Sequence, residues 1–305
     1  MKKQKIIVFG AGAVGGFFGG LIAENTNHDV LFTARGTHYQ AIKDNGLTIK
    51  TITGQRTLKV EVTDSLTEYS GYADLIIVTV KAHDTSPAIE QLRPVIGTHT
   101  QILTIQNGLE SYEKLSAQFG AGKVIRGLCR IGVEVTSPGV ITHSYLGVIV
   151  FGEDSGAVTT RIDALEELFI QSGIEYNISA DIRRAVWKKF TWNSIFNILS
   201  GILNVTLDKL YANPETIALC EQIACEIQRL AAKDGVTLTA KDMEWILSVS
   251  STLGQFRTST FQDRQKGKPL EYDTFTGYIV RLAEKYAVPV PINSILLAMI
   301  KAVNA

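Results

Sequence analysis

Long apolar runs, clustered cysteines and an excess of charge of one sign are all missing from this chain of 305 residues. No segment approaches the roughly 18 consecutive apolar residues that a membrane-spanning helix needs. The basic start, "MKKQKIIVFGAGAVGG", breaks into glycines too early for a signal peptide. We therefore expect a soluble protein without a membrane partner.

The charges balance, because Lys plus Arg and Asp plus Glu each number 30. No basic excess indicates a nucleic acid as partner. The three cysteines, Cys129, Cys220 and Cys225, form no closely spaced pair, which favours a reducing, cytoplasmic compartment over a disulfide framework. The five histidines lack the spacing of metal ligands, so we expect no metal site.

The first part of the chain alternates short β-branched runs with helical stretches, which predicts an α/β fold. Several of the runs are apolar on both faces, as is typical of strands buried between two helical layers. This pattern favours a parallel, Rossmann-type doubly wound sheet. The expected strands are 5–9, 29–34, 57–62, 74–80, 101–105 and 123–128.

The pattern changes near residue 180, which predicts a boundary between two domains. Before it we expect further strands in 138–153, a helix over 161–173 and a last strand over 174–179. After it the expected helices are 181–203, 214–235, 239–255, 273–287 and 292–303, with Asp181, Asp208, Thr239 and Asn293 as N-cap or first-turn residues and Gly235 as a stop. The prediction is a dinucleotide-binding domain at 1–180 and an all-helical domain at 181–305.

A glycine motif follows the first expected strand directly and opens a helix. In a βαβ unit, the first glycine permits a tight turn, the second lets the backbone approach a pyrophosphate, and the third allows close packing. The pyrophosphate then binds the free N–H groups at the helix start. The motif consists of Gly10, Ala11, Gly12, Ala13, Val14 and Gly15.

The second expected strand ends in "LFTARGTH", without the carboxylate that usually accepts hydrogen bonds from the ribose of NAD. Arg35 offers a cation and a planar donor fork to a 2′-phosphate, so the sequence favours NADP(H) as cofactor. The alternative is an arginine on a solvated loop.

Polar residues follow two more strands, at the sheet edge where ligands gather in this fold. "LIIVTVKAHD" delivers Lys81, and "ILTIQNGLE" delivers Gln106, Asn107 and Gly108. We expect Asn107 to reach the nicotinamide or the reacting carbonyl. Asn-Gly is also an ordinary turn signal, which is the competing structural explanation.

The stretch "WKKFTWNSIFN" reads as a buried helix that carries one polar stripe, Lys189, Asn193 and Asn197, at intervals of four residues. A buried polar stripe must meet other polar groups or a ligand. The alternative is a solvated stripe with Lys189 exposed. Lys188 is expected to be a surface residue and a control for Lys189. Farther on, Ser259, Asp263 and Glu271 precede or open a helix, where carboxylates are favourable anyway.

Taken in order, these residues resemble the 2-dehydropantoate 2-reductase (ketopantoate reductase) family over nearly the whole chain. The family pattern combines the glycine motif, a "QNG" turn, a helix with Trp187, Lys189, Asn193 and Asn197, and then Ser259, Asp263, Glu271 and Asp273. The resemblance implies NADPH-dependent reduction of 2-dehydropantoate in pantothenate and coenzyme A biosynthesis. One departure is Leu207, which stands where the family often has a further substrate-binding Asn, although Asn204 is near.

The resemblance also implies roles. Lys189 is the general acid, while Asn193, Asn197 and Ser259 hold the substrate's carboxylate and hydroxyl groups. Asn107 and Glu271 serve substrate and cofactor, Lys81 contacts the cofactor, and Arg35 meets the 2′-phosphate. Some domain closure around the substrate is expected.

Other functions stay open from sequence alone: a reductase of another 2-oxo acid, a β-hydroxyacid dehydrogenase, which also uses Lys-x-x-x-Asn, or an NADP(H)-binding sensor. The expected partner is a small 2-oxo acid. A homodimer and a monomer are both compatible with the sequence.

Overall fold

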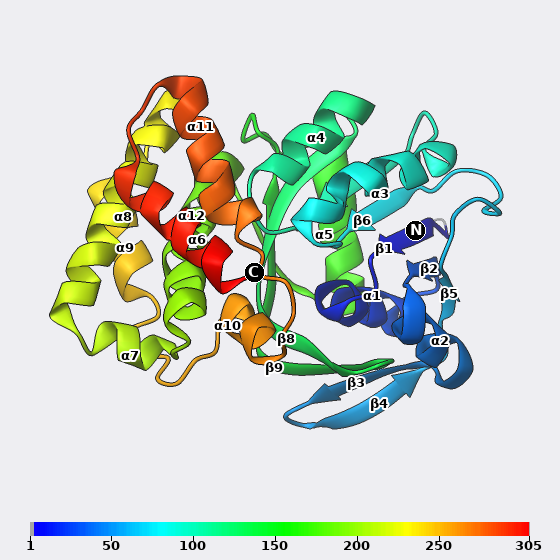
Figure 1. Ribbon diagram of the computed structural model, residues 1–305. Coiled ribbons are helices and arrows are strands. Elements are labelled where there is room, and N and C mark those ends of the chain that lie inside the picture. Colours follow the sequence, from blue (N-terminus) through cyan, green and yellow to red (C-terminus); the bar gives the residue numbers. More distant parts are fainter. Residues whose placement is uncertain (1–2, 305) are drawn as a thin grey trace. The chain divides into compact units, whose positions relative to one another are not determined.

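The computed structural model describes residues 3–304, which fall into two compact units (Figure 1). The first unit holds the described residues up to Asn107 together with Ser111–Ile182, and the second holds Gly108–Glu110 with the rest of the chain from Arg183. The domains expected at 1–180 and 181–305 stay a prediction, because contacts define a compact unit whereas independent folding defines a domain.

The first unit is an α/β structure, as predicted. Six of its strands, β5-β2-β1-β6-β7-β8, are parallel and follow the order 3-2-1-4-5-6 of dinucleotide-binding folds. The strands are β1 (Lys5–Phe9), β2 (Asp29–Thr33), β3 (Leu47–Thr51), β4 (Gly54–Leu58), β5 (Glu61–Thr63), β6 (Leu75–Val78), β7 (Gln101–Thr104), β8 (Val124–Ser137), β9 (Val140–Gly152) and β10 (Glu175–Ile178). The helices are α1 (Ala13–Asn25), α2 (Gly36–Asn45), α3 (Thr85–Leu92), α4 (Glu110–Phe119) and α5 (Thr160–Ser172).

The Rossmann-type doubly wound sheet is confirmed, and antiparallel pairings whose direction had not been predicted extend its parallel strands. Strands β8 and β9 form a long antiparallel hairpin, and β3 pairs with β4 in the same way. The run 57–62 is also not one strand, because β4 and β5 lie at opposite ends of the strand order. The chain therefore passes from one end of the strand order to the other at residues 59–60, and the β3–β4 hairpin had not been predicted.

Each face of the sheet has its own apolar core, as the two-sided apolar strands predict. In β1, Ile6 and Val8 pack with α1 and α5, whereas Ile7 and Phe9 pack with α3 and α4. This alternation follows from the two-residue period of a strand. The doubly wound layering places the carboxyl ends of the parallel strands at one edge.

Helix α1 is enclosed on several sides, which explains the glycines that continue beyond the motif. A Cβ on Gly19 would lie 2.7 Å from side-chain atoms of Val8 and Phe32, and one on Gly16 would lie 2.0 Å from Ile141. A Cβ on Gly20 would meet Ile49 of β3. The β3 strand and the β8–β9 hairpin therefore cover faces of α1 that β1 and β2 leave open.

The second unit is helical, with α6 at its centre. It contains α6 (Ile182–Leu203), α7 (Leu207–Tyr211), α8 (Pro214–Lys233), α9 (Ala240–Ser248), α10 (Ser259–Gln265), a π-helical turn η3 (Asp273–Gly277), α11 (Tyr278–Tyr286) and α12 (Pro291–Val303). The expected helices are confirmed, except that 239–255 ends early at Ser248 and that α7 and α10 had not been predicted. Thr239 caps α9 through a capping box, and Gly235 follows α8 at φ +79°.

Candidate active site

Four predicted residues or motifs follow four neighbouring parallel strands. The order β2-β1-β6-β7 places Arg35, the glycine motif, Lys81 and Asn107 one after another along the carboxyl edge. The strand order reverses between β1 and β6, and this switch point is where open α/β sheets bind ligands. The first unit thus gathers its predicted cofactor residues at one edge.

The glycine motif forms an open cradle at the start of α1. Gly10 has φ +107°, and a Cβ there would lie 2.7 Å from Val80. Gly12 is exposed, and a Cβ on it would meet no atom within 4 Å. A Cβ on Gly15 would lie 2.3 Å from the Gly10 carbonyl oxygen. No side chain caps α1 and no acidic residue lies in its first turn, so its N–H groups suit an anion such as a pyrophosphate.

Side chains from three other segments hold this cradle, and sequence reasoning singled out none of them. The Gly10 N–H donates to Thr33 Oγ1 over 2.9 Å, and Thr79 Oγ1 donates to the Gly10 carbonyl over 2.7 Å. His38 Nδ1 accepts from the Gly139 N–H at 3.0 Å, so its Nε2 carries the proton and donates to the Ala11 carbonyl at 2.8 Å. The cradle is therefore fixed before any ligand arrives.

The flanking predicted residues differ in exposure. Arg35 is exposed and occupies the N-cap position of α2, without a side-chain capping bond. Lys81 is exposed and precedes a short 3₁₀ turn, η1 (Ala82–Asp84). Asn107 is half-buried, and Gly108 after it has φ +89°. Both cationic side chains are thus accessible at the sheet edge.

In the second unit, the stripe on α6 is buried at its amides. Asn193 is 4% exposed and Asn197 is 3% exposed, while Lys189 is half-buried. The apolar residues around them are buried in the core, including Phe190, Phe196 and others of the same helix. The solvated-stripe alternative is therefore wrong for the two amides.

Helix α10 begins beside this stripe and brings Ser259 to it. Asn197 Nδ2 donates to Ser259 Oγ over 3.4 Å and to Asn193 Oδ1 over 3.5 Å. Both distances are long compared with the usual 2.9–3.0 Å, so these buried amides make weak bonds within the chain. A Cβ on Gly201, the next stripe position, would lie 2.7 Å from Thr260, so the missing side chain lets α10 approach.

The remaining predicted residues of this unit differ in burial and in their place in the fold. Glu271 is buried and lies before η3, and Asp263 is half-buried within α10. Leu207 is fully buried in the core. Asn204 has φ +58° just beyond α6, and its Oδ1 accepts from Gln265 at 2.6 Å. Asn204 is therefore hydrogen-bonded just after the end of α6 and does not continue the stripe of Lys189, Asn193 and Asn197.

The expectation that Lys188 is a surface residue is wrong. Its ammonium lies 3.0 Å from Asp242 Oδ1 and 4.5 Å from the centre of the Trp245 ring. The Asp242 side chain is only 4% exposed and also binds Arg184. Lys188 therefore has a structural role, and sequence gave no sign of it because Asp242 lies 54 positions away.

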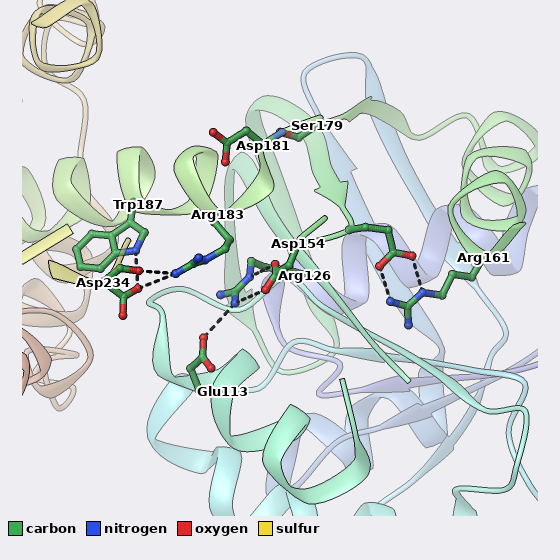
Figure 2. A network of polar contacts seen from close by, with 10 residues as sticks. Glu113, Arg126, Asp154, Arg161, Ser179, Asp181, Arg183, Trp187 and Asp234 are labelled. Carbon is green, nitrogen blue, oxygen red and sulfur yellow. Dashed lines mark hydrogen bonds and ion pairs between the residues drawn. The ribbon is translucent and has the colours of Figure 1, made fainter. Parts of the chain in front are cut away.

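Two further polar networks hold the chain on either side of residue 182 (Figure 2). In the second unit, Asp234 accepts from Arg183 and from Trp187 Nε1, which ties the first turns of α6 to the end of α8. In the first unit, the buried Arg126 donates to Asp154 over 2.7 Å and to Glu113 over 3.0 Å. These groups are mutually paired, which indicates a structural role.

Within residues 3–304, no group of three or more His, Cys, Asp or Glu residues is arranged to hold a metal ion. In the same range, no helix combines the length and apolar character that crossing a membrane requires. No disulfide joins cysteines in the part of the chain that the structure describes, where Cys129 and Cys220 are buried and Cys225 is exposed.

Comparison with known proteins gives consistent matches over both units. Residues 6–156 match the family model described as ketopantoate reductase PanE/ApbA, and residues 181–304 match its C-terminal model. A 2-dehydropantoate 2-reductase of Pyrococcus abyssi is 31% identical over 302 residues, covering 99% of this chain and 98% of the relative. One of Mesorhizobium japonicum is 29% identical over 318 residues, covering 98% and 97%.

Among solved structures, the 2-dehydropantoate 2-reductase of Geobacter metallireducens superposes with a TM-score of 0.90 at 30% identity, covering 97% of this chain and 99% of that one. The fold and the glycine cradle define a Rossmann-type protein with a helical second unit. With the matches to both of its models, the chain belongs to the ketopantoate reductase family.

Proposed function

We propose that this protein reduces 2-dehydropantoate to pantoate with NADPH, as a step of pantothenate and coenzyme A biosynthesis. The relatives named for this reaction align over almost their whole length. The observation that carries the proposal is the buried amide pair of α6. Asn193 and Asn197 are 4% and 3% exposed, and within residues 3–304 the Asn197 side chain makes only long hydrogen bonds. A small oxo acid would satisfy these donors better.

The cofactor fits the first unit. The open N–H groups at the start of α1 would bind the pyrophosphate of a dinucleotide, and Gly12 leaves room for it. Arg35, at the end of the neighbouring strand, would bind a 2′-phosphate, which supports NADP(H) over NAD(H). Lys81 and Asn107 would hold the nicotinamide half, with Glu271 near its ribose. When bound, the reduced nicotinamide supplies a hydride to the ketone carbon.

The residues of the second unit would bind the substrate, stabilise the negative charge that develops on it and donate a proton. Asn193, Asn197 and Ser259 would hold the carboxylate and hydroxyl groups of the substrate. Negative charge develops on the carbonyl oxygen during reduction, and an ammonium group at Lys189 would stabilise it and donate the proton. The half-buried position of Lys189 excludes part of the water that would otherwise screen this charge.

The decisive experiment measures steady-state rates with ketopantoate, several other 2-oxo acids and 3-hydroxy acids, using NADPH, NADH and their oxidised forms. The highest kcat/KM is expected for ketopantoate with NADPH. A higher kcat/KM for another 2-oxo acid would mean that this protein has a different substrate within the family. Oxidation of 3-hydroxy acids with NAD would indicate a β-hydroxyacid dehydrogenase, and tight cofactor binding without turnover would indicate a sensor.

We also propose a cytoplasmic location. Its support is the sparse cysteine content, since Cys129, Cys220 and Cys225 are few, odd in number and without a CxxC pair, which favours a reducing compartment. Fractionation of the native host, followed by detection of the protein, tests this location.

A further inference from the structure

The loops after β6 and β7 are joined by one buried side chain, Gln106. Its Nε2 donates to the Val80 carbonyl over 2.9 Å and to Thr85 Oγ1 over 3.0 Å. Val80 immediately precedes Lys81, and Gln106 immediately precedes Asn107. We propose that Gln106 and Thr85 are positioning residues, which hold Lys81 and Asn107 in a fixed relation to each other for the nicotinamide cofactor.

The hydrogen atoms of this network can be fully assigned. Thr85 Oγ1 has one proton, which it donates to the Ala82 carbonyl at 2.8 Å. Its 3.0 Å contact with Ser111 Oγ must therefore be donated by Ser111. Both protons of the Gln106 amide nitrogen are used, and its Oε1 accepts from Thr104 Oγ1 at 3.0 Å. Every bond has one donor and one acceptor.

The network is also protected from water. Thr85, Thr104, Ser111 and Gln106 are 0%, 3%, 4% and 8% exposed. A satisfied buried network rigidifies what it joins, because breaking one bond leaves a buried polar group unpaired. Here it joins the 3₁₀ turn after Lys81, the QNG turn and the first turn of α4. Two loops that would otherwise move separately are thus held as one piece.

The inference rests on the proposed function, since Lys81 and Asn107 are assigned there to the cofactor. Preorganised ligands bind more tightly because less ordering is lost on binding. Thr85→Val removes the hydroxyl while keeping the shape, and Thr85→Ser retains the hydroxyl. Thr100→Val is the matched control: Thr100 is buried at the other end of β7, donates to the Ala73 carbonyl and accepts from the Gly97 N–H.

The experiment measures the Kd for NADPH by fluorescence titration, the melting temperature, and hydrogen exchange in 79–86 and 105–110. Thr85→Val is expected to raise Kd roughly tenfold and to speed exchange in both segments. Thr85→Ser should remain within about twofold of the wild type. Thr100→Val should lower the melting temperature but leave Kd unchanged. Gln106→Leu, which removes both donors, is the second variant and should behave as Thr85→Val does.

The inference would be overturned if Thr85→Val, Gln106→Leu and Thr100→Val had the same Kd for NADPH and similar losses of melting temperature. The network would then be purely structural. Failure of the proposed function looks different. In that case the wild type binds NADPH without reducing any 2-oxo acid, and the Kd comparison still decides the role of Gln106. A wild type that binds neither NADPH nor NADH would overturn both.

Discussion

The ammonium of Lys188 lies 3.0 Å from Oδ1 of the buried Asp242. Lys188 is next to Lys189 on helix α6, but it is bound to this carboxylate. Adjacent residues of a helix point about 100° apart, so the two lysines face different surroundings. Replacing Lys188 would disturb the packing of α9 against α6. The comparison for Lys189 therefore needs a different lysine, and the exposed Lys233 at the end of α8 is suitable.

Lys189→Ala should lower kcat with ketopantoate by roughly 10²–10⁴-fold, because the proton donor is lost. The Kd for NADPH should stay within about threefold, since the cofactor is assigned to the first unit. Lys233→Ala should change neither value. Stopped-flow turnover and a fluorescence titration measure the two quantities, and an unchanged kcat in Lys189→Ala would refute the acid assignment.

Asn197→Ala should raise the KM for the 2-oxo acid about 10–100-fold, the equivalent of losing one hydrogen bond to a charged group, and should alter NADPH binding little. Thr191→Val is the matched control on α6. Thr191 is fully buried and donates to the Trp187 carbonyl, away from the stripe. Steady-state kinetics measure the KM for the 2-oxo acid in both variants. The same KM in Asn197→Ala and Thr191→Val would show that the Asn197 amide does not bind substrate.

Arg35→Ala should raise the KM for NADPH roughly 10–100-fold, because a charge-assisted contact to the 2′-phosphate is removed. The KM for NADH should change by less than about threefold, because NADH lacks that phosphate. The ratio of the two kcat/KM values is the measurement. Equal losses with both cofactors would mean that Arg35 acts on something other than the 2′-phosphate.

Asp242→Asn should lower the free energy of unfolding at pH 7 by about 1.5–3 kcal/mol. Burial alone would raise the pKa of Asp242, but hydrogen bonds from Thr239, Arg184 and Lys188 outweigh it and hold the pKa well below its ordinary value. A depressed folded-state pKa adds stability above the unfolded-state pKa of about 4, and that stability is lost as the pH falls.

The difference in unfolding free energy between wild type and Asp242→Asn should therefore shrink below about pH 4. Urea titrations of both proteins at pH 7, 5, 4 and 3 measure it. A difference that stays constant over this range would mean that the carboxylate charge does not stabilise the fold.

Features set by neighbouring residues in sequence were predictable. The glycine cradle and β1 were expected from the eleven residues Lys5–Gly15, because strand, turn and helix start follow one another there. The burial of Asn193 and Asn197 followed from the apolar residues around them, which left no solvated face. Local periodicity was thus sufficient for the main parts of the candidate site.

Features set by distant partners were not predictable. Glu226 on α8 accepts from the backbone N–H groups of Ile292 and Asn293 at 3.0 Å, so a carboxylate 66 to 67 positions away covers the start of α12. Nothing near Asn293 indicates this. The pairing of Lys188 with Asp242 and the β3–β4 hairpin depend in the same way on tertiary contacts that a pattern of single residues does not encode.

The three residues Gly108–Glu110 belong to the second unit although the chain on both sides belongs to the first. A Cβ on Gly108 would lie 2.7 Å from Thr274 Cγ2, and Arg281 lies 3.5 Å from Glu110. The polypeptide thus passes between the units at 107–108, 110–111 and 182–183. A single cut near residue 182 therefore separates the second unit from Gly108–Glu110, three residues that pack within it.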